Sequence, residues 1–214
     1  MPYGGSMNTM RKHRRTTAGF TVIEMLVVLV IMAIVVAYAI PSYKTMVTNY
    51  RMSGELNDVK ADVELARSTA VREGANVTMC PSSNPTASTP TCASSTNTQW
   101  NTGWIIFTDT STTVNSQSYS PTSGDVLIRV HSPLANNDSL VSSSTDTSTT
   151  VSSLTFNRMG GAMSIGSVGT DFGWLVINDA NSDANMIRCV KIGLSGTISV
   201  YSPQGGPQSQ STCP

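Results

Sequence analysis

Apolar residues are distributed in two different ways along the 214-residue chain. From Phe20 to Tyr43 they follow one another almost without interruption, and Glu24 is the single charged residue among them. A helix of this length, at about 1.5 Å per residue, spans roughly 36 Å, which is enough to cross the hydrocarbon core of a membrane. The sequence therefore predicts a transmembrane helix over residues 20–43.

The next segment, residues 44–74, has the period of an amphipathic helix. Its apolar residues recur at spacings of three and four, and charged residues occupy many of the other positions. The apolar positions are Leu56, Val59, Val63, Ala66 and Ala70, and the charged residues expected on the other faces are Asp58, Lys60, Asp62, Glu64, Arg67 and Arg72. Gly74 is expected to stop the helix, and Pro41 and Gly54 are expected to bend or locally melt it.

After Gly74, short runs rich in β-branched and aromatic residues alternate with loops rich in Ser and Thr. Seven of these runs are predicted strands: 76–80, 103–108, 125–131, 151–157, 172–178, 186–192 and 197–201. We interpret the segments between them as exposed loops of one domain. Because the strands follow the long helix, the sequence predicts an α+β fold in which this helix packs on the antiparallel β-sheet of a globular domain, residues 75–214.

The charges are unevenly distributed, although the formal net charge is zero. Four basic residues and no acidic residue precede the apolar run: Arg11, Lys12, Arg14 and Arg15. By the positive-inside rule, this cluster keeps the N-terminal end of the helix in the cytoplasm. Since the chain has 13 basic and 13 acidic residues, a chain cut near residue 19 keeps nine basic and thirteen acidic ones, a net charge of −4. This balance argues against nonspecific binding of nucleic acid.

Four cysteines follow the apolar run: Cys80, Cys92, Cys189 and Cys213. None belongs to a C-x-x-C pair, and His131 is the one histidine after residue 19. We therefore expect no metal site, no cofactor and no enzymatic activity, because zinc sites and histidine-based triads need such residues. In an exported chain, an even number of cysteines predicts disulfides. Of the three possible connectivities, we expect the most local one, Cys80–Cys92 with Cys189–Cys213.

The apolar run itself allows three interpretations. A secretory signal peptide would be cut after Ala39, which ends a small-x-small pattern at residues 37–39. A simple membrane anchor would need no cut. Neither interpretation explains Glu24, because a carboxylate in the bilayer interior costs about 2.5–3.5 kcal/mol on insertion scales.

The third interpretation rests on a resemblance. Residues 18–28 read AGFTVIEMLVV after the basic cluster, and this pattern resembles the class III signal of type IV prepilins and type II secretion pseudopilins. The resemblance implies that a membrane prepilin peptidase removes the leader, residues 1–19, by cutting after Gly19, and methylates the new N-terminal Phe20. It also implies that the Glu24 carboxylate pairs with the Phe20 amine of a neighbouring subunit during filament assembly. A more ordinary role for Glu24 is to cap the N-terminus of its own helix.

The rest of the chain resembles the GspH/FimT group of minor pilins and pseudopilins, and within it the FimU-like branch. The segments that carry this resemblance are ELARSTAVREGANVTMCPSS, WNTGWIIFTD and LTFNRMG. It implies a type IV pilin-like fold and a minor pilin that is incorporated into, or primes, the type IV pilus, an apparatus of adhesion and twitching motility. The implied partners are other major and minor pilins, prepilin peptidase and, before assembly, the inner membrane. The globular domain would then lie in the periplasm, and later on the pilus at the cell surface.

Two alternatives share this resemblance. One is a minor pseudopilin of type II secretion, which has the same fold and processing. The other is a DNA-uptake minor pilin of the FimT type, whose members carry a Gly-Arg-x-Arg motif. The corresponding segment, Gly196-Thr197-Ile198-Ser199, lacks both arginines, and Arg188 and Lys191 nearby are expected to be ordinary solvated strand residues. DNA is therefore not an expected partner.

Residues 179–185 have the alternating Asp and Asn residues of a calcium-binding loop. Ala184 stands where such a loop needs glycine, and Val190 stands where it needs a bidentate glutamate. We therefore expect a polar turn and no calcium site.

Overall fold

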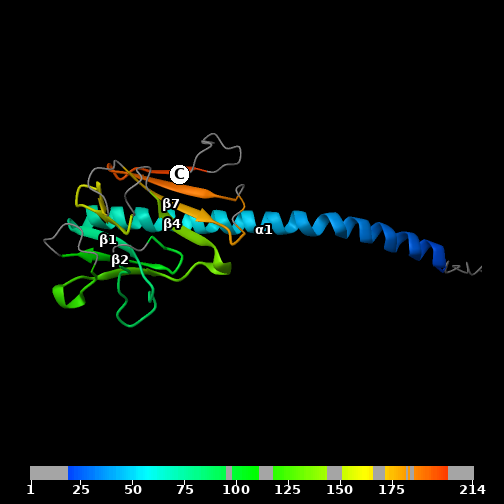
Figure 1. The fold of residues 1–214 in the computed structure, drawn as a ribbon, viewed down its shortest axis with the longest axis horizontal. Coiled ribbons are helices and arrows are strands. Elements are labelled where there is room, and N and C mark those ends of the chain that lie inside the picture. The colour runs from blue at the N-terminus through cyan, green and yellow to red at the C-terminus, as the bar shows by residue number, and fades with distance from the viewer. Residues whose placement is uncertain are drawn as a thin grey trace, which may run out of the picture. The chain divides into compact units, whose positions relative to one another are not determined.

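The computed structural model describes residues 19–94, 98–110, 118–143, 151–165, 172–181, 183 and 186–201. The chain divides into two compact units, residues 1–44 and residues 45–214, and we call the second unit the head. Helix α1 (Val22–Glu73) precedes all the strands (Figure 1). The described strands are β1 (Asn76–Pro81), β2 (Trp104–Asp109), β3 (Leu127–His131), β4 (Ser139–Ser143), β5 (Ser153–Phe156), β6 (Ala162–Ile165), β7 (Phe172–Asn178), β8 (Arg188–Gly193) and β9 (Ile198–Tyr201). Two short 3-10 helices, η1 (Pro121–Ser123) and η2 (Ala135–Asn137), flank β3.

Helix α1 ends one residue before Gly74, which has a left-handed φ of 65°. This agrees with the predicted stop, because glycine adopts that conformation without a steric cost. The helix continues through Pro41 and Gly54, so the local melting expected there is not found. One missing backbone donor and one glycine, which costs about 1 kcal/mol relative to alanine, do not interrupt a helix of this length.

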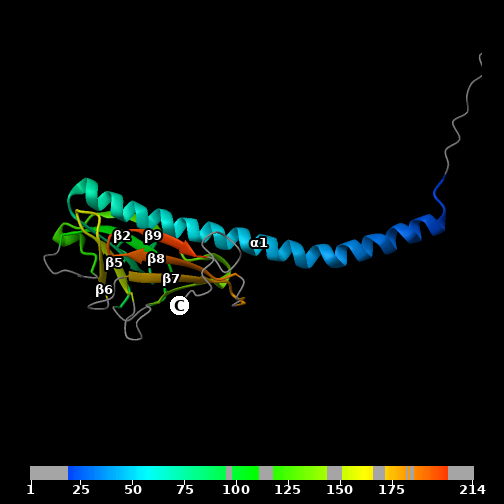
Figure 2. The ribbon, with the colours of Figure 1, turned by 90° about the horizontal axis from the view of Figure 1, so that it is seen from above.

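The strands of the head form two antiparallel sheets. One has the order β3-β2-β1-β5-β6 and the other the order β4-β7-β8-β9. Residues 45–73 of α1 run along one side of these strands (Figure 2). The α+β class with antiparallel sheet is therefore confirmed.

Two strands, β4 and β6, were not predicted. Each forms an edge of its sheet, and each is short. The sequence of β4, SLVSS, contains only two apolar residues, and Leu140 is the one that is fully buried. An edge strand with so little apolar sequence lacks the signal on which strand prediction depends.

One face of α1 forms the core of the head together with both sheets. All five predicted apolar positions, Leu56, Val59, Val63, Ala66 and Ala70, are buried, and Met52 joins them. They pack in one cluster with Val77, Met79, Trp100, Ile106, Phe156, Leu175 and Val190 of the strands and loops. The helix is therefore part of the head's core, as the amphipathic pattern predicts.

Asp62 departs from that pattern. We expected it on an outer face, but it is only 1% exposed. The indole N–H of Trp104 donates to Oδ2 of Asp62 at 2.8 Å, and Nε of Arg129 lies 3.0 Å from Oδ1. A buried carboxylate is tolerated when it has such partners, and both partners come from strands that helical periodicity cannot reveal.

We expect Asp62→Ala to lower the free energy of unfolding by about 2 kcal/mol, because it leaves the buried indole N–H without an acceptor. Asp58→Ala is the matched control, since Asp58 lies one turn earlier on α1 with a side chain that is 62% exposed; its expected effect is below about 0.5 kcal/mol. Urea unfolding followed by tryptophan fluorescence measures both variants. Equal losses would show that the Asp62 contacts do not stabilise the head.

The disulfide Cys80–Cys92 is present, with a Cα–Cα distance of 5.6 Å. This confirms the first predicted pair, and closing a loop of this length stabilises a fold by about 3 kcal/mol in the chain-entropy model. Cys189 is also disulfide-bonded. Cys213 lies outside the described residues, so the pair Cys189–Cys213 stays a prediction.

Candidate assembly site

Glu24 lies in the first turn of α1, where it forms a reciprocal pair of hydrogen bonds with Thr21. The backbone N–H of Glu24 donates to Oγ1 of Thr21 at 3.3 Å, and the backbone N–H of Thr21 donates to Oε2 of Glu24 at 3.5 Å. This arrangement is a capping box, which satisfies two of the N–H groups that lack a partner at the start of a helix. The carboxylate also lies at the positive end of the helix dipole. Glu24 therefore caps its own helix.

Thr21 was not among the predicted site residues. The signal was available, because Thr21 and Glu24 have the spacing Thr-x-x-Glu directly before an apolar run. The chemistry of Glu24 thus includes a local role that does not depend on any neighbouring subunit.

Gly19 and Phe20 lie immediately before this cap. A Cβ atom added at Gly19 would meet no atom within 4 Å, so the fold of this chain does not require glycine there. The side chain of Phe20 is 75% exposed. The predicted cleavage point therefore lies in an open part of the described chain.

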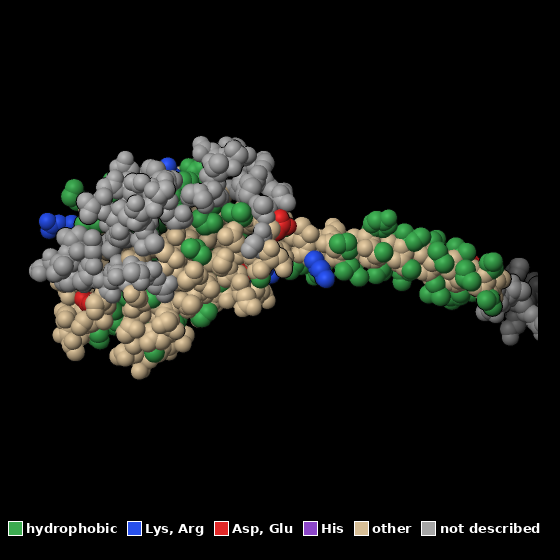
Figure 3. All heavy atoms as spheres, viewed as in Figure 1, with side chains coloured by type: hydrophobic (Ala, Val, Ile, Leu, Met, Phe, Trp, Pro, Cys, Tyr) green, Lys and Arg blue, Asp and Glu red, His purple; other side chains and the backbone are tan. Residues whose placement is uncertain are grey.

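The first half of α1 has an apolar surface on all sides. Every large apolar side chain between Val22 and Ile40 is exposed. Green side chains are spread along the visible face of this part of the helix (Figure 3). By length and composition, this helix could cross a membrane. Such a surface is stable only when lipid or other protein covers it.

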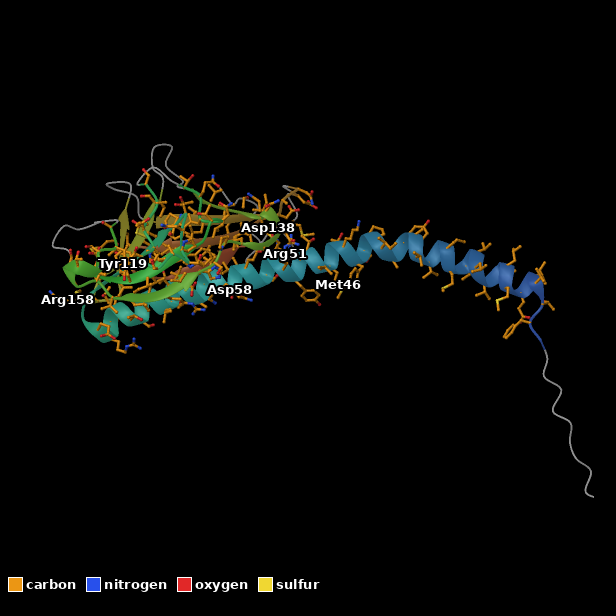
Figure 4. All side chains as sticks on the ribbon, turned by 90° about the horizontal axis from the view of Figure 1, so that it is seen from below. Met46, Arg51, Asp58, Tyr119, Asp138 and Arg158 are labelled. Atoms are coloured by element: carbon orange, nitrogen blue, oxygen red, sulfur yellow. A yellow bond between two sulfur atoms is a disulfide. The ribbon has the colours of Figure 1, made fainter. Side chains whose placement is uncertain are left out.

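In the head, a cluster of charged side chains connects α1 to the sheets, in addition to the Asp62 contacts. Arg51 of α1 and Asp138, the residue before β4, point toward each other (Figure 4). Nε and Nη2 of Arg51 donate to the two oxygens of Asp138 at 2.6 and 3.0 Å, and the N–H of Ala180 donates to Oδ1 of Asp138 at 3.1 Å. Glu55 lies one turn after Arg51 and is also buried. We call Arg51, Glu55 and Asp138 the polar seam; nothing in the sequence pattern indicated it.

The segment that corresponds to the DNA-binding motif contains the end of the tight turn between β8 and β9 and the first two residues of β9. Gly196 has a φ of 76°, and a Cβ atom there would collide with the carbonyl oxygen of Gly160. The N–H of Gly193 donates to the carbonyl of Thr197 at 2.9 Å, which closes the turn. Gly196 is therefore explained by the geometry of this turn.

Arg188 is buried, so the expectation that it is a solvated strand residue is wrong. Its Nη2 donates to Oδ1 of Asn49 at 2.9 Å, and its Nη1 donates to the carbonyl of Ile187 at 2.8 Å. Burial lowers the pKa of Arg188. Lys191 is half-buried, with its ammonium 5.5 Å from the centre of the Trp174 ring. The sequence of this strand did not indicate the contact between Arg188 and Asn49 of α1.

The segment with calcium-like spacing forms a turn around Asp179, as far as it is described. The carboxylate of Asp179 accepts from the N–H groups of Asn181 and Asp183, at 3.2 and 2.8 Å. Residues 182, 184 and 185 of this segment lie outside the described part of the chain. Within the described residues, no group of three or more His, Cys, Asp or Glu side chains could hold a metal ion.

A hollow of about 500 Å³ lies where α1 meets the strands that follow it. Its lining is polar and apolar in mixture, and contains neither histidine nor cysteine: Gly74, Ala75, Asn76, Asp109, Thr110, Asn157, Arg158, Met159 and Met163. Asp109 accepts a hydrogen bond from Thr78 within the core at 3.2 Å. The hydroxyl of Thr110 donates to Oδ1 of Asp125 at 2.8 Å, so it is engaged in a contact within the fold.

Comparisons with known proteins agree with these features. Residues 55–196, about two thirds of the chain, match the family model described as type II transport protein GspH. Residues 14–40 match the model of the prokaryotic N-terminal methylation motif. Among curated proteins, no sequence matches this chain significantly.

Two solved structures are similar to this chain, and both are crystal structures of the type IV minor pilin FimU from Pseudomonas aeruginosa PAO1. The first is 19% identical, with a TM-score of 0.50, over 74% of this chain and 93% of FimU. The second is 18% identical, with a TM-score of 0.46, over 72% of this chain and 94% of FimU. At 19% identity, the similarity to the first FimU structure shows the fold alone, which is that of a pilin. Since the GspH model covers more than half of the sequence, the chain belongs to the GspH family of pilin-like proteins.

Proposed function

We propose that this protein is a minor pilin that is incorporated into the type IV pilus or primes its assembly. Membership of a pilin family implies assembly with other pilins, and the methylation motif at residues 14–40 implies membrane anchoring before that assembly. The observation that carries the proposal is the first half of α1, which exposes apolar side chains on every side and has one carboxylate in its first turn. Such a helix fits a filament core, in which apolar helices cover one another.

Processing is the first step of this proposal. A membrane prepilin peptidase would cut after Gly19 and methylate the new N-terminal amine of Phe20. The open surroundings of Gly19 support this role. The fold does not require glycine at this position, so recognition by a peptidase would explain why glycine is there. The basic cluster would keep residues 1–19 on the cytoplasmic side, with residues 20–43 in the inner membrane and the head in the periplasm.

Assembly is the second step. The cut creates a cation one residue before the capping box, at the positive end of the helix dipole, where a cation is unfavourable. The Glu24 carboxylate offsets this charge within one subunit, and in the filament it would pair with the Phe20 amine of a neighbour. Because an unpaired charge is costly in a medium of low dielectric, this pairing favours one axial register between subunits.

We further propose that the protein has no enzymatic activity and needs no cofactor, since proteins of the pilin families have structural roles. DNA uptake is not favoured, because Gly196 is explained by its turn and Arg188 is engaged with Asn49. A minor pseudopilin of type II secretion is the second candidate, because the description of the matching family model names type II transport.

Deletion of the gene, combined with analysis of sheared surface fibres, separates the two candidates. We expect the protein in the sheared pilus fraction, and we expect the deletion to reduce piliation and twitching while secretion of exoproteins stays normal. Loss of exoprotein secretion with normal pili would instead identify a pseudopilin.

A further inference from the structure

The two carboxylates of the polar seam have different surroundings. Asp138 is fully buried, and its oxygens accept three hydrogen bonds, two from Arg51 and one from the N–H of Ala180. Glu55 is only 8% exposed, and as an ionised carboxylate neither of its buried oxygens has a donor. A buried anion without a donor is strongly unfavourable, whereas a neutral acid in the same place can itself donate to a neighbouring carboxylate.

The charged groups around Glu55 come from several elements. On α1, Arg51 favours the ionised form of Glu55, and the exposed Asp58 opposes it. From the segment before β4, Asp138 opposes it more strongly, through its charge and as the acceptor of a hydrogen bond from the neutral acid. Asp179, after β7, acts on Arg51. Burial is the largest effect, and together these groups raise the pKa of Glu55 to about 7.

We propose that Glu55 is a proton-operated latch between α1 and the end of the sheet at which β4 begins and β7 ends. In its neutral form Glu55 donates a hydrogen bond to Asp138, and the pair shares one negative charge that Arg51 balances. When Glu55 loses this proton, two carboxylates face one guanidinium inside the head, and the contact between α1 and the segments 135–138 and 179–180 weakens. Because Asp138 also accepts from Ala180, the proton links α1 to both of these segments.

The sign of the pH dependence follows from the two states of Glu55. Its ordinary pKa of 4.5 applies to the unfolded chain, and its pKa in the head is about 7. Between these values the folded head binds a proton that the unfolded chain has released, so stability falls as the pH rises from about 4.5 to about 7 and changes no further above that. Over this range the folding equilibrium constant should fall by up to about 300-fold on account of Glu55.

Urea unfolding of the full-length protein in a non-ionic detergent tests this proposal. All three tryptophans, Trp100, Trp104 and Trp174, lie in the head, so tryptophan fluorescence reports on the head alone. Glu55→Gln is the matched variant, because it keeps the size and a hydrogen-bond donor but cannot ionise. We expect the stabilities of the two proteins to differ by no more than about 4-fold at pH 5, and the variant to be about 100-fold more stable, as a ratio of equilibrium constants, at pH 7.5.

The rest of the chain is the same in both proteins, so its contributions cancel in this difference. A difference that stays constant from pH 5 to pH 7.5 would overturn the proposal. If the variant does not fold, carboxyl NMR of the wild-type protein decides, because the chain has only four glutamates to resolve. Titration of Glu55 near pH 7 would support the latch, and titration of Glu55 near pH 4.5 would overturn it.

Discussion

Replacing Gly19 with valine is expected to leave an uncut, membrane-bound precursor that still carries residues 1–19. In the structure a Cβ atom at this position meets no atom within 4 Å, so the substitution does not disturb the fold. The effect of the substitution must then arise at the peptidase. There, a branched side chain beside the scissile bond moves that bond away from its reactive position. Displacements of about 1 Å commonly cost two orders of magnitude in rate, and we expect a loss of cleavage on the order of 100-fold.

Gly54→Ala is the control for this experiment. Gly54 also has no atom within 4 Å of an added Cβ, and it lies in α1 far along the chain from the cut. Immunoblots of membrane fractions, with intact masses of the purified chains, should show normal cleavage for Gly54→Ala and precursor for Gly19→Val. Normal cleavage of Gly19→Val would remove Gly19 from the processing site.

Glu24→Ala is expected to produce processed protein in the membrane but little protein in sheared fibres. Removing one partner of a buried ion pair costs about 3–5 kcal/mol. In full, this cost would reduce incorporation by two to three orders of magnitude. In a lone subunit in the bilayer, Glu24 can pair with the Phe20 amine of the same chain, so the variant loses a contact before assembly as well as in the fibre. Part of the free-energy cost therefore cancels, and we expect incorporation to fall by about 10-fold to 100-fold.

The capping box makes a sharper version of this experiment possible, because Glu24 has two roles that different variants separate. Glu24→Gln keeps an oxygen that can accept from the N–H of Thr21, but it removes the charge. Thr21→Val keeps the charge but removes the oxygen that accepts from the N–H of Glu24. If the charge sets the register between subunits, Glu24→Gln fails to incorporate as Glu24→Ala does, and Thr21→Val incorporates. Failure of Thr21→Val together with success of Glu24→Gln would mean that helix capping is the role of Glu24.

The sequence was sufficient to predict a structural feature where one physical signal dominated. The long apolar run predicted a helix, the spacing of Leu56, Val59 and Val63 predicted its buried face, and the glycine at position 74 predicted its end. The structure contains all three. The local disulfide Cys80–Cys92 also followed from the cysteine positions. These features depend on residues that are close together in the chain.

The features that the sequence did not predict involve residues that contact each other but are far apart in the chain. Asp62 and Arg188 look like solvent-facing charges within their own elements, but they are buried by contacts with Trp104 and Asn49. Glu55 and Asp138 are separated by more than eighty residues of sequence that carries no pattern linking them. Only the packing of α1 on the sheets brings these groups together, so the polar seam was not predictable from periodicity.

We propose above all that this chain is a pilin processed at Gly19. The intact mass and N-terminal peptide of the protein, purified from membranes or from sheared fibres of the native cell, test it most directly. The claim predicts a mature chain that begins with N-methylated Phe20. A chain that begins with Ile40, after cleavage behind Ala39, would establish a secretory signal peptide and contradict the claim.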